Sequence, residues 1–293
     1  MKLIVASFFS ALVLAAFTAT AAINDVFPTD YIALKDGSVN LVSYLYRREQ
    51  VGPYTRSKRL IDGNLNTDIA AMRISRFFDV GEHQTFSSVA VLSWAQSNTS
   101  PAQLAGIMGQ SAQGMGDLRL GGTYWLNRDR EKREYLAANM FVILPTGSYD
   151  QNRLINIGEN RWKWVLGGGW MQPLGEKWII DVAPEIVFYG KNPRYLVSHT
   201  LEQNISSALT GYLRYRITPQ WQLMAGAQLN RGGETIIDGV DQHNAPENTR
   251  LSIGTIFVTE KQRQWQLRLS QDTSTESGFK TTSELVLRYS LVF

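Results

Sequence analysis

Histidine and serine are the residue types in this 293-residue chain that could support hydrolysis. The three histidines, His83, His199 and His243, each fall at a predicted strand end or in a loop. A serine nucleophile needs a histidine base within hydrogen-bond reach and a third polar group that orients the base. Ser198 adjoins His199, but neighbouring residues of a strand point to opposite faces. The sequence therefore favours no hydrolase site, and because cysteine is absent it excludes disulfides, Cys-based zinc sites and thiol nucleophiles.

Charged residues recur on the polar side of segments that alternate between apolar and polar residues. Asp181 and Glu185 share one such side with Lys177 and could act as a paired acid and base, although paired charges inside a barrel are usually salt bridges. Charges that cannot face lipid must pair or be solvated in the lumen, where they could also line a polar path or a ligand site. The lumen-lining candidates are Arg73, Asp117, Arg119, Lys163, Asp181, Glu185, Glu202, Arg214, Arg216, Arg250, Arg268, Glu284 and Arg288.

The segments that carry these charges have the length and alternation of membrane-crossing strands, which run for roughly 10 residues each. The clearest is the last, in which apolar Leu285, Leu287, Tyr289, Leu291 and Phe293 alternate with mostly polar residues. Others lie at 118–126, 136–144, 178–188, 201–216, 221–230 and 264–270. With a first strand near 39–48 the count is about 12, an even number as single-chain bacterial barrels require. The pattern predicts an all-β, transmembrane, antiparallel up-and-down β-barrel over residues 38–293.

The connections between these segments alternate between short and long. Short connectors at 128–130, 173–176, 218–219 and 259–261 are expected as periplasmic turns, and longer stretches at 50–66, 96–113, 148–159, 190–199, 232–247 and 272–278 as extracellular loops. Tryptophans near strand ends, Trp94, Trp125, Trp162, Trp178, Trp221 and Trp265, are expected to form interfacial girdles. A soluble β-sandwich is the alternative fold, but it explains the alternation of loop lengths poorly.

The first residues predict a cleaved Sec-type signal peptide and therefore export. Lys2 is followed by an uncharged apolar run at 3–17 and by small residues at Ala19 and Ala21, so we expect cleavage after Ala21 or Ala22 and a leader of residues 1–22. No other apolar stretch approaches the roughly 20 residues of a membrane helix, so a spanning chain must be a barrel. Residues 23–37 would then form either a periplasmic lead or a plug. The expected location is the outer membrane of a Gram-negative bacterium.

Several short motifs follow one another in the middle of the chain. They are Gly114-Met115-Gly116-Asp117, Leu144-Pro145-Thr146-Gly147-Ser148-Tyr149, Asn156-Ile157-Gly158-Glu159-Asn160-Arg161-Trp162 and Gly167-Gly168-Gly169-Trp170. With these motifs, residues 113–293 resemble the outer-membrane β-barrel family labelled putative meta-pathway of phenol degradation proteins. The terminal Phe293 likewise resembles the signal that bacterial barrel-assembly machinery recognises. The resemblance implies a monomeric barrel that passes hydrophobic or aromatic compounds across the outer membrane, similar in general idea to long-chain fatty acid transporters.

We therefore expect an outer-membrane channel or transporter for small hydrophobic or aromatic compounds. Its expected partners are outer-membrane lipid, the barrel-assembly machinery and a small hydrophobic or aromatic ligand. A net charge of +3 without a dense basic block argues against nucleic acid, and we expect neither a cofactor nor a metal. A barrel of about 12 strands should have a narrow or plugged lumen. The alternatives are a lipid-hydrolysing barrel, which a Ser–His pair on the outer rim would favour, and a structural or adhesive barrel.

Overall fold

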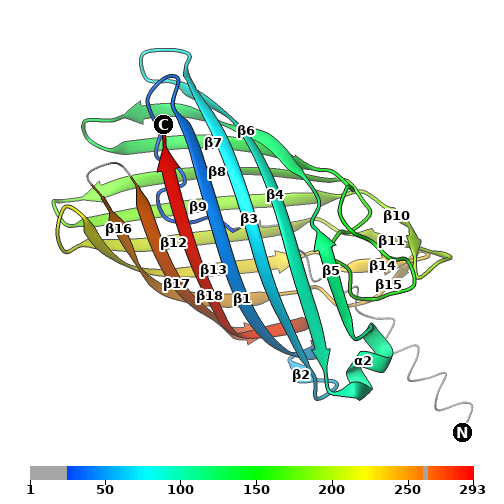
Figure 1. Ribbon diagram of the computed structural model, residues 1–293. Coiled ribbons are helices and arrows are strands. Elements are labelled where there is room, and N and C mark those ends of the chain that lie inside the picture. The colour runs from blue at the N-terminus through cyan, green and yellow to red at the C-terminus, as the bar shows by residue number, and fades with distance from the viewer. Residues whose placement is uncertain (1–24, 260–262) are drawn as a thin grey trace, which may run out of the picture.

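The computed structural model describes residues 25–259 and 263–293, and it shows a single closed barrel wall (Figure 1). Within these residues the main sheet has 14 strands, of which β2 (Lys58–Arg59) and β5 (Ser111–Met115) are short and pair with one neighbour each. The remaining twelve strands form the wall. In order they are β1 (Val39–Thr55), β3 (Asn64–Asp79), β4 (Thr85–Ser100), β6 (Arg119–Asp129), β7 (Glu134–Ile143), β8 (Lys163–Leu174), β9 (Trp178–Tyr189), β12 (Ser206–Arg216), β13 (Trp221–Gly232), β16 (Asn248–Val258), β17 (Gln264–Thr275) and β18 (Gly278–Val292).

The ring is closed by pairing between the first and last strands. β18 pairs antiparallel with β17 on one side and with β1 on the other. At the end of this contact the backbone amides of Val39 and Phe293 each donate to the other residue's carbonyl, at 3.2 and 2.9 Å. The all-β up-and-down barrel with about 12 strands is therefore confirmed. The expected signal peptide lies outside the described residues, and the assembly role of Phe293 stays a prediction.

The two faces of the wall have the inverted polarity of a protein that is surrounded by lipid. Along β17, buried Gln266, Arg268 and Ser270 alternate with exposed Leu267 and Leu269. Lipid-facing side chains of a membrane barrel are apolar and the interior is polar, which is this arrangement. Among the described residues, no helix has the length and apolar character that a membrane crossing requires.

Aromatic pairs join neighbouring strands at the end of the barrel that carries the short turns. The ring centroids are 4.7 Å apart for Trp178 and Tyr215, and 4.3 Å apart for Trp265 and Tyr289. Such pairs on an outer face are typical of an interfacial girdle. Trp125 is a correction to the girdle expected from the sequence, because it points inward, is only 1% exposed and bonds to an N-terminal carbonyl.

The other end of the barrel carries the longer connections, one short helix and a second sheet. The helix is α2 (Ala102–Met108), and the 4-stranded sheet contains β10 (Asn192–Tyr195), β11 (His199–Gln203), β14 (Thr235–Ile237) and β15 (Val240–Asp241). The expected loop at 272–278 is wrong, because β17 runs to Thr275 and β18 begins at Gly278. Polar residues do not end a strand where its backbone still has a pairing partner. Here β17 pairs with β16 as far as Thr275, and β18 pairs with β1 from Gly278 onward.

Candidate functional site

The N-terminal residues 25–37, which we call the plug segment, lie inside the barrel from Asp25 to Leu34 and are exposed at 35–37. Phe27 is buried against the rings of Tyr44 and Tyr46, at centroid distances of 5.5 and 6.4 Å. The indole Nε1 of Trp125 donates to the carbonyl of Tyr31 at 2.8 Å. Each of these partners lies on a wall strand, so the plug segment is fixed to several strands at once.

A glycine in the wall makes room for the plug segment. The ring of Tyr31 lies so close to β8 that a Cβ atom on Gly169 would be 2.1 Å from its Cγ atom. The hydroxyl of the same tyrosine accepts a hydrogen bond from Asn139 Nδ2 at 2.7 Å. Because no side chain fits at this position, part of the glycine-rich motif in β8 is explained by the contact between the wall and the plug segment.

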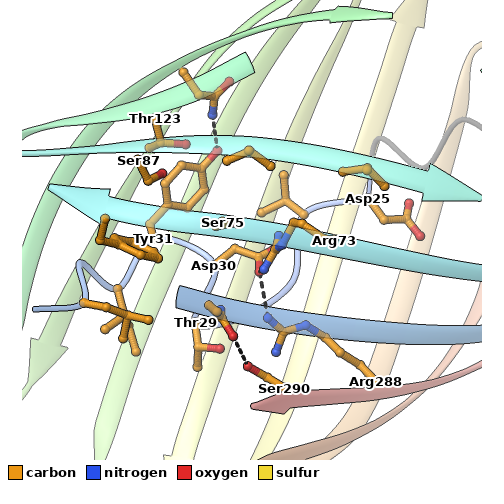
Figure 2. Close-up of a pocket in the computed structure, with 18 of the residues that line it drawn as sticks. Asp25, Thr29, Asp30, Tyr31, Arg73, Ser75, Ser87, Thr123, Arg288 and Ser290 are labelled. Carbon is orange, nitrogen blue, oxygen red and sulfur yellow. Dashed lines mark hydrogen bonds and ion pairs between the residues drawn. The ribbon is translucent and has the colours of Figure 1, made fainter. Parts of the chain in front are cut away.

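Asp30 of the plug segment lies between two arginines of the wall (Figure 2). Its Oδ1 atom is 2.7 Å from Arg73 Nη2 and 3.0 Å from Arg288 Nη2, and its other oxygen accepts from the backbone amide of Phe27 at 2.9 Å. Burial raises the pKa of Asp30, but the two arginines outweigh burial and hold this pKa below its usual value. The carboxylate is therefore an anionic anchor for the plug segment.

A second cluster of charges joins the plug segment to the same region of the wall, on β17, β18 and their neighbours. Arg268 Nη2 lies 2.7 Å from Asp25 Oδ2 and 2.9 Å from Glu284 Oε1. Glu284 also accepts from Arg48 at 2.6 Å, and Arg250 bonds to Asp272 at 2.8 Å. The structure thus brings the sequence-selected Arg250, Arg268 and Glu284 together. Asp25 and Asp30 were missed because they precede the first strand.

The two carboxylates of β9 that could act as a paired acid and base, Asp181 and Glu185, have different surroundings. Asp181 is bonded to Arg214 on β12, with Oδ2 to Nε at 2.7 Å, and both side chains are buried. Glu185 is 8% exposed and has no hydrogen bond or ion pair to another described residue. Arg119 lies over the ring of Phe141 at 3.8 Å from its centroid. Asp181 is therefore part of a salt bridge, whereas Glu185 forms none with the residues that the structure describes.

Two of the lumen-lining candidates lie away from this group. Glu202 belongs to β11 of the second sheet and pairs with Lys191 at 2.7 Å, and Arg216 lies at the end of β12, where it donates to the carbonyl of Glu176 at 2.9 Å. The sequence pattern treats residues 201–216 as one strand, whereas the structure divides them between β11 and β12. The break between Gln203 and Ser206 leaves Glu202 in the second sheet and outside the barrel wall.

The family motifs form one clamp at the loop end of the barrel. Asp117, between β5 and β6, accepts hydrogen bonds from the backbone amides of Gly147 at 2.8 Å and Glu159 at 2.9 Å. A Cβ atom on Gly158 would lie 2.7 Å from the backbone of Gly147. The carboxylate and the glycines together hold the loop between β7 and β8 against the wall, so Asp117 has a structural contact here.

The other motif residues extend this clamp. Asn156 Oδ1 accepts from the amide of Asp150 at 2.7 Å, and the hydroxyl of Tyr149 donates to the carbonyl of Arg194 at 3.0 Å. Among the remaining motif residues, Gly114 has a positive φ of 145°, and the backbone amide of Gly116 donates to the carbonyl of Ser93. Trp162 is exposed. The last motif residue is Pro145.

A buried ion cluster stands beside the clamp. Glu159 accepts from Arg161 Nη2 at 2.6 Å and from the ammonium of Lys163, and Arg161 also reaches Gln203 Oε1 at 2.5 Å. Burial raises the pKa of Glu159, but the two cations outweigh burial and lower this pKa to about 2. Lys163, one of the lumen-lining candidates, thus binds Glu159 and stabilises the loop between β7 and β8.

Replacing Glu159 with glutamine should therefore destabilise the barrel by about 3–5 kcal/mol, because it leaves two buried cations without their carboxylate. The pKa of Glu159 in the folded protein is about 2, below its usual 4.5. Its stabilisation is present above pH 4.5 and lost as the pH falls from 4.5 through about 2. Thermal unfolding in detergent over this pH range should show a smaller decrease for Glu159→Gln than for wild type. Identical melting temperatures at neutral pH would contradict the assignment.

The residues at 25–259 and 263–293 enclose a cavity toward each end of the lumen. The turn-side cavity has a volume of about 200 Å³ and lies between the plug segment and β3, β4, β6 and β7, with Val89, Val91 and Phe141 among its lining residues. The loop-side cavity, of about 300 Å³, is lined mainly by polar residues such as Asn230 and Asn248. Asp25 and Glu185 line both cavities. These two carboxylates therefore mark the neck of the lumen.

The histidines are paired with carboxylates at exposed positions. His199 Nδ1 lies 2.5 Å from Asp238 Oδ2, and His243 Nδ1 lies 3.1 Å from Glu234 Oε1. In the part of the chain that the structure describes, no histidine is bonded to a serine hydroxyl, and no group of three or more potential metal-binding residues occurs. The arrangement that would favour a barrel hydrolase does not occur around His199.

Comparisons with known proteins agree with this architecture. A solved structure described as the COG4313 outer membrane channel from Pseudomonas putida F1 is 28% identical, covers 92% of this chain and 100% of its own, and has a TM-score of 0.86. The β domain of the Bordetella autotransporter BrkA, with 12% identity and a TM-score of 0.54 over 88% of this chain and all of its own, shows a similar fold only. No curated protein matches the sequence.

A family model described as "Putative MetA-pathway of phenol degradation" matches residues 49–289. This range begins within β1 and ends within β18, so it covers most of the barrel wall. It also includes the clamp, the ion cluster and every wall residue that contacts Asp30. The chain is an outer-membrane β-barrel and belongs to this family.

Proposed function

We propose that the protein is an outer-membrane channel for small hydrophobic or aromatic compounds. The observation that carries the proposal is the turn-side cavity, where Val89, Val91 and Phe141 of the wall face Tyr31 and Ile32 of the plug segment. Apolar cavities of about 150 Å³ can hold benzene. A cavity of about 200 Å³ is therefore large enough for one substituted ring.

The polar end of the lumen supports the same function. The loop-side cavity can admit a molecule from the long-loop end, and the neck at Asp25 and Glu185 connects it to the turn-side cavity. The channel from Pseudomonas putida F1 matches over the full length of its own chain, which supports a channel as the class of protein. The charge pairs that hold the plug segment keep the lumen narrow between the two cavities.

Uptake of labelled aromatic compounds by cells with and without the gene, together with single-channel conductance of the refolded protein, tests this proposal. Val91→Phe should reduce uptake several-fold because it fills the turn-side cavity. Leu92→Phe is the matched control, since Leu92 is the next residue of β4 and is exposed on the lipid side. Equal uptake with and without the gene, combined with an absence of conductance, would remove the channel function.

A further inference from the structure

A row of mostly polar residues, interrupted by one glycine and one alanine, crosses eight strands of the wall in register. Each member is the direct cross-strand partner of the next, and all of them face the lumen. In order, from β4 to β16, they are Ser87, Thr123, Asn139, Gly167, Glu185, Ala208, Asn230 and Asn248. We call them the polar row. The charges that stabilise the plug segment, Arg73, Arg268 and Arg288, lie on other strands.

The polar row runs from one end of the barrel to the other. Strands of a membrane barrel are tilted by about 35–45°, so a line perpendicular to the strands climbs around the wall. Ser87 lies near the start of β4, beside a short turn, whereas Asn248 is the first residue of β16, next to a long loop. The row therefore forms a ramp that connects the turn end with the loop end.

The two cavities lie along this ramp. The turn-side cavity is lined by Ser87, Thr123, Asn139 and Glu185, and the loop-side cavity by Glu185, Ala208, Asn230 and Asn248. Glu185 is the member of the row that both cavities share. Its neighbour Ala208, which also lines the loop-side cavity, has only a methyl side chain. On the other side, the amide of Asn139 occupies the position that a side chain on Gly167 would take.

Two acceptor groups of the row have no hydrogen-bond donor among the residues at 25–259 and 263–293. Glu185 is more than nine-tenths buried and has no hydrogen bond or ion pair to another described residue. Asn139 Oδ1 is buried without a partner, and it would lie 2.8 Å from a Cβ atom on Gly167, on the side toward Glu185. Buried acceptors are nearly always hydrogen-bonded in folded proteins. A donor that comes from a bound molecule would satisfy both groups.

We propose that the polar row guides the head group of the transported molecule, and that Glu185 is its hydrogen-bond acceptor at the neck. This inference rests on the proposed channel function and specifies its substrates as small apolar bodies that carry a hydroxyl or ammonium donor. Neighbouring strands are about 4.8 Å apart, so the nearest polar members of the row on either side of Glu185, Asn139 and Asn230, are two strand spacings away, or about 10 Å. Glu185 is therefore the acceptor of the row where the two cavities meet, between the amides of Asn139 on one side and Asn230 on the other. The apolar body meanwhile contacts Val89 and Phe141 in the turn-side cavity.

Three compounds that share one phenylethyl body test the inference: 2-phenylethanol, 2-phenylethylamine and ethylbenzene. The measurement is the expression-dependent part of their uptake by whole cells. Glu185→Leu should lower uptake of the alcohol and the amine by about tenfold, as expected for one lost hydrogen bond to a charged group, and leave ethylbenzene unchanged. Glu185→Gln, which keeps an acceptor, should restore the alcohol but not the amine.

Two further variants control for folding and for the removal of a carboxylate. Glu202→Leu makes the same substitution in the second sheet and should behave as wild type. Ala208→Leu fills the space beside Glu185 without changing charge, and it should slow uptake of both donor-bearing compounds. This variant replaces Glu185→Leu as the test if Glu185→Leu fails to fold. An equal decrease for all three compounds in the Glu185 or Ala208 variant would overturn the polar row while leaving the channel function intact. If wild type transports none of the three, both proposals fail.

Discussion

Replacing Asp30 with leucine should release the plug segment and raise the single-channel conductance several-fold. The substitution leaves Arg73 and Arg288 without the carboxylate that lies 2.7 and 3.0 Å from their guanidinium groups. Removing one partner from a buried ion pair costs about 3–5 kcal/mol, and here one carboxylate serves both arginines. The arginines would then become solvated in an open lumen.

Conductance in planar bilayers measures this effect directly, and thermal unfolding in detergent measures the lost stability. Asp36→Asn is the matched control, because Asp36 lies in the same segment, is exposed and accepts one backbone hydrogen bond that asparagine can also accept. Its conductance should equal that of wild type. An Asp30→Leu barrel with unchanged conductance would show that Asp30 does not hold the plug segment in place.

Gly169→Leu should displace the plug segment from the opposite side without altering any charge. The ring of Tyr31 occupies the position of the leucine side chain, since even a Cβ atom would lie 2.1 Å from its Cγ atom. Overpacking a filled site usually costs about 1–3 kcal/mol, and relief here requires Tyr31 to leave its bonds to Asn139 and Trp125. We expect higher conductance and a shift in tryptophan emission as water reaches Trp125.

Gly211→Ala provides the comparison for this substitution. Gly211 lies on the wall strand β12, and a Cβ atom there would meet its nearest neighbour, the carbonyl oxygen of Asp181, at 3.9 Å. This variant should keep the conductance and emission of wild type. If Gly169→Leu also keeps both, the close contact with Tyr31 is not what fixes the plug segment.

The barrel could be predicted from the sequence because the alternation of lipid-facing and lumen-facing residues is a property of each strand by itself. Residues such as Leu267 and Arg268 must alternate between lipid and lumen in every strand, whichever strands become neighbours. Strand length at the loop end could not be predicted in this way, because beyond the lipid a strand continues for as long as a neighbour pairs with its backbone. The segment at 272–278 is an example, since its polar residues predict a loop, whereas β17 pairs with β16 as far as Thr275 and β18 pairs with β1 from Gly278 onward.

The candidate site was only partly predictable, since it depends on contacts between distant parts of the chain. The thirteen lumen-lining candidates comprise eight cations and five carboxylates, and this excess of cations was a signal that anions were missing. Asp25 and Asp30 supply them from a segment that has no strand pattern. The isolation of Glu185 could not be predicted, because it depends on Gly167 and Ala208 becoming its neighbours across two pairs of strands.

The contact between β1 and β18 also sets the order in which the molecule can be completed. Asn40 pairs with Val292, so the sheet remains an open ribbon until the end of the chain has been synthesised and delivered. The docking site for Asp30 needs Arg73 from one side of this seam and Arg288 from the other. That site does not exist in the ribbon, so the two ion pairs of Asp30 can both form only when the seam joins. Closure of the cylinder therefore also completes this anchor of the N-terminal segment.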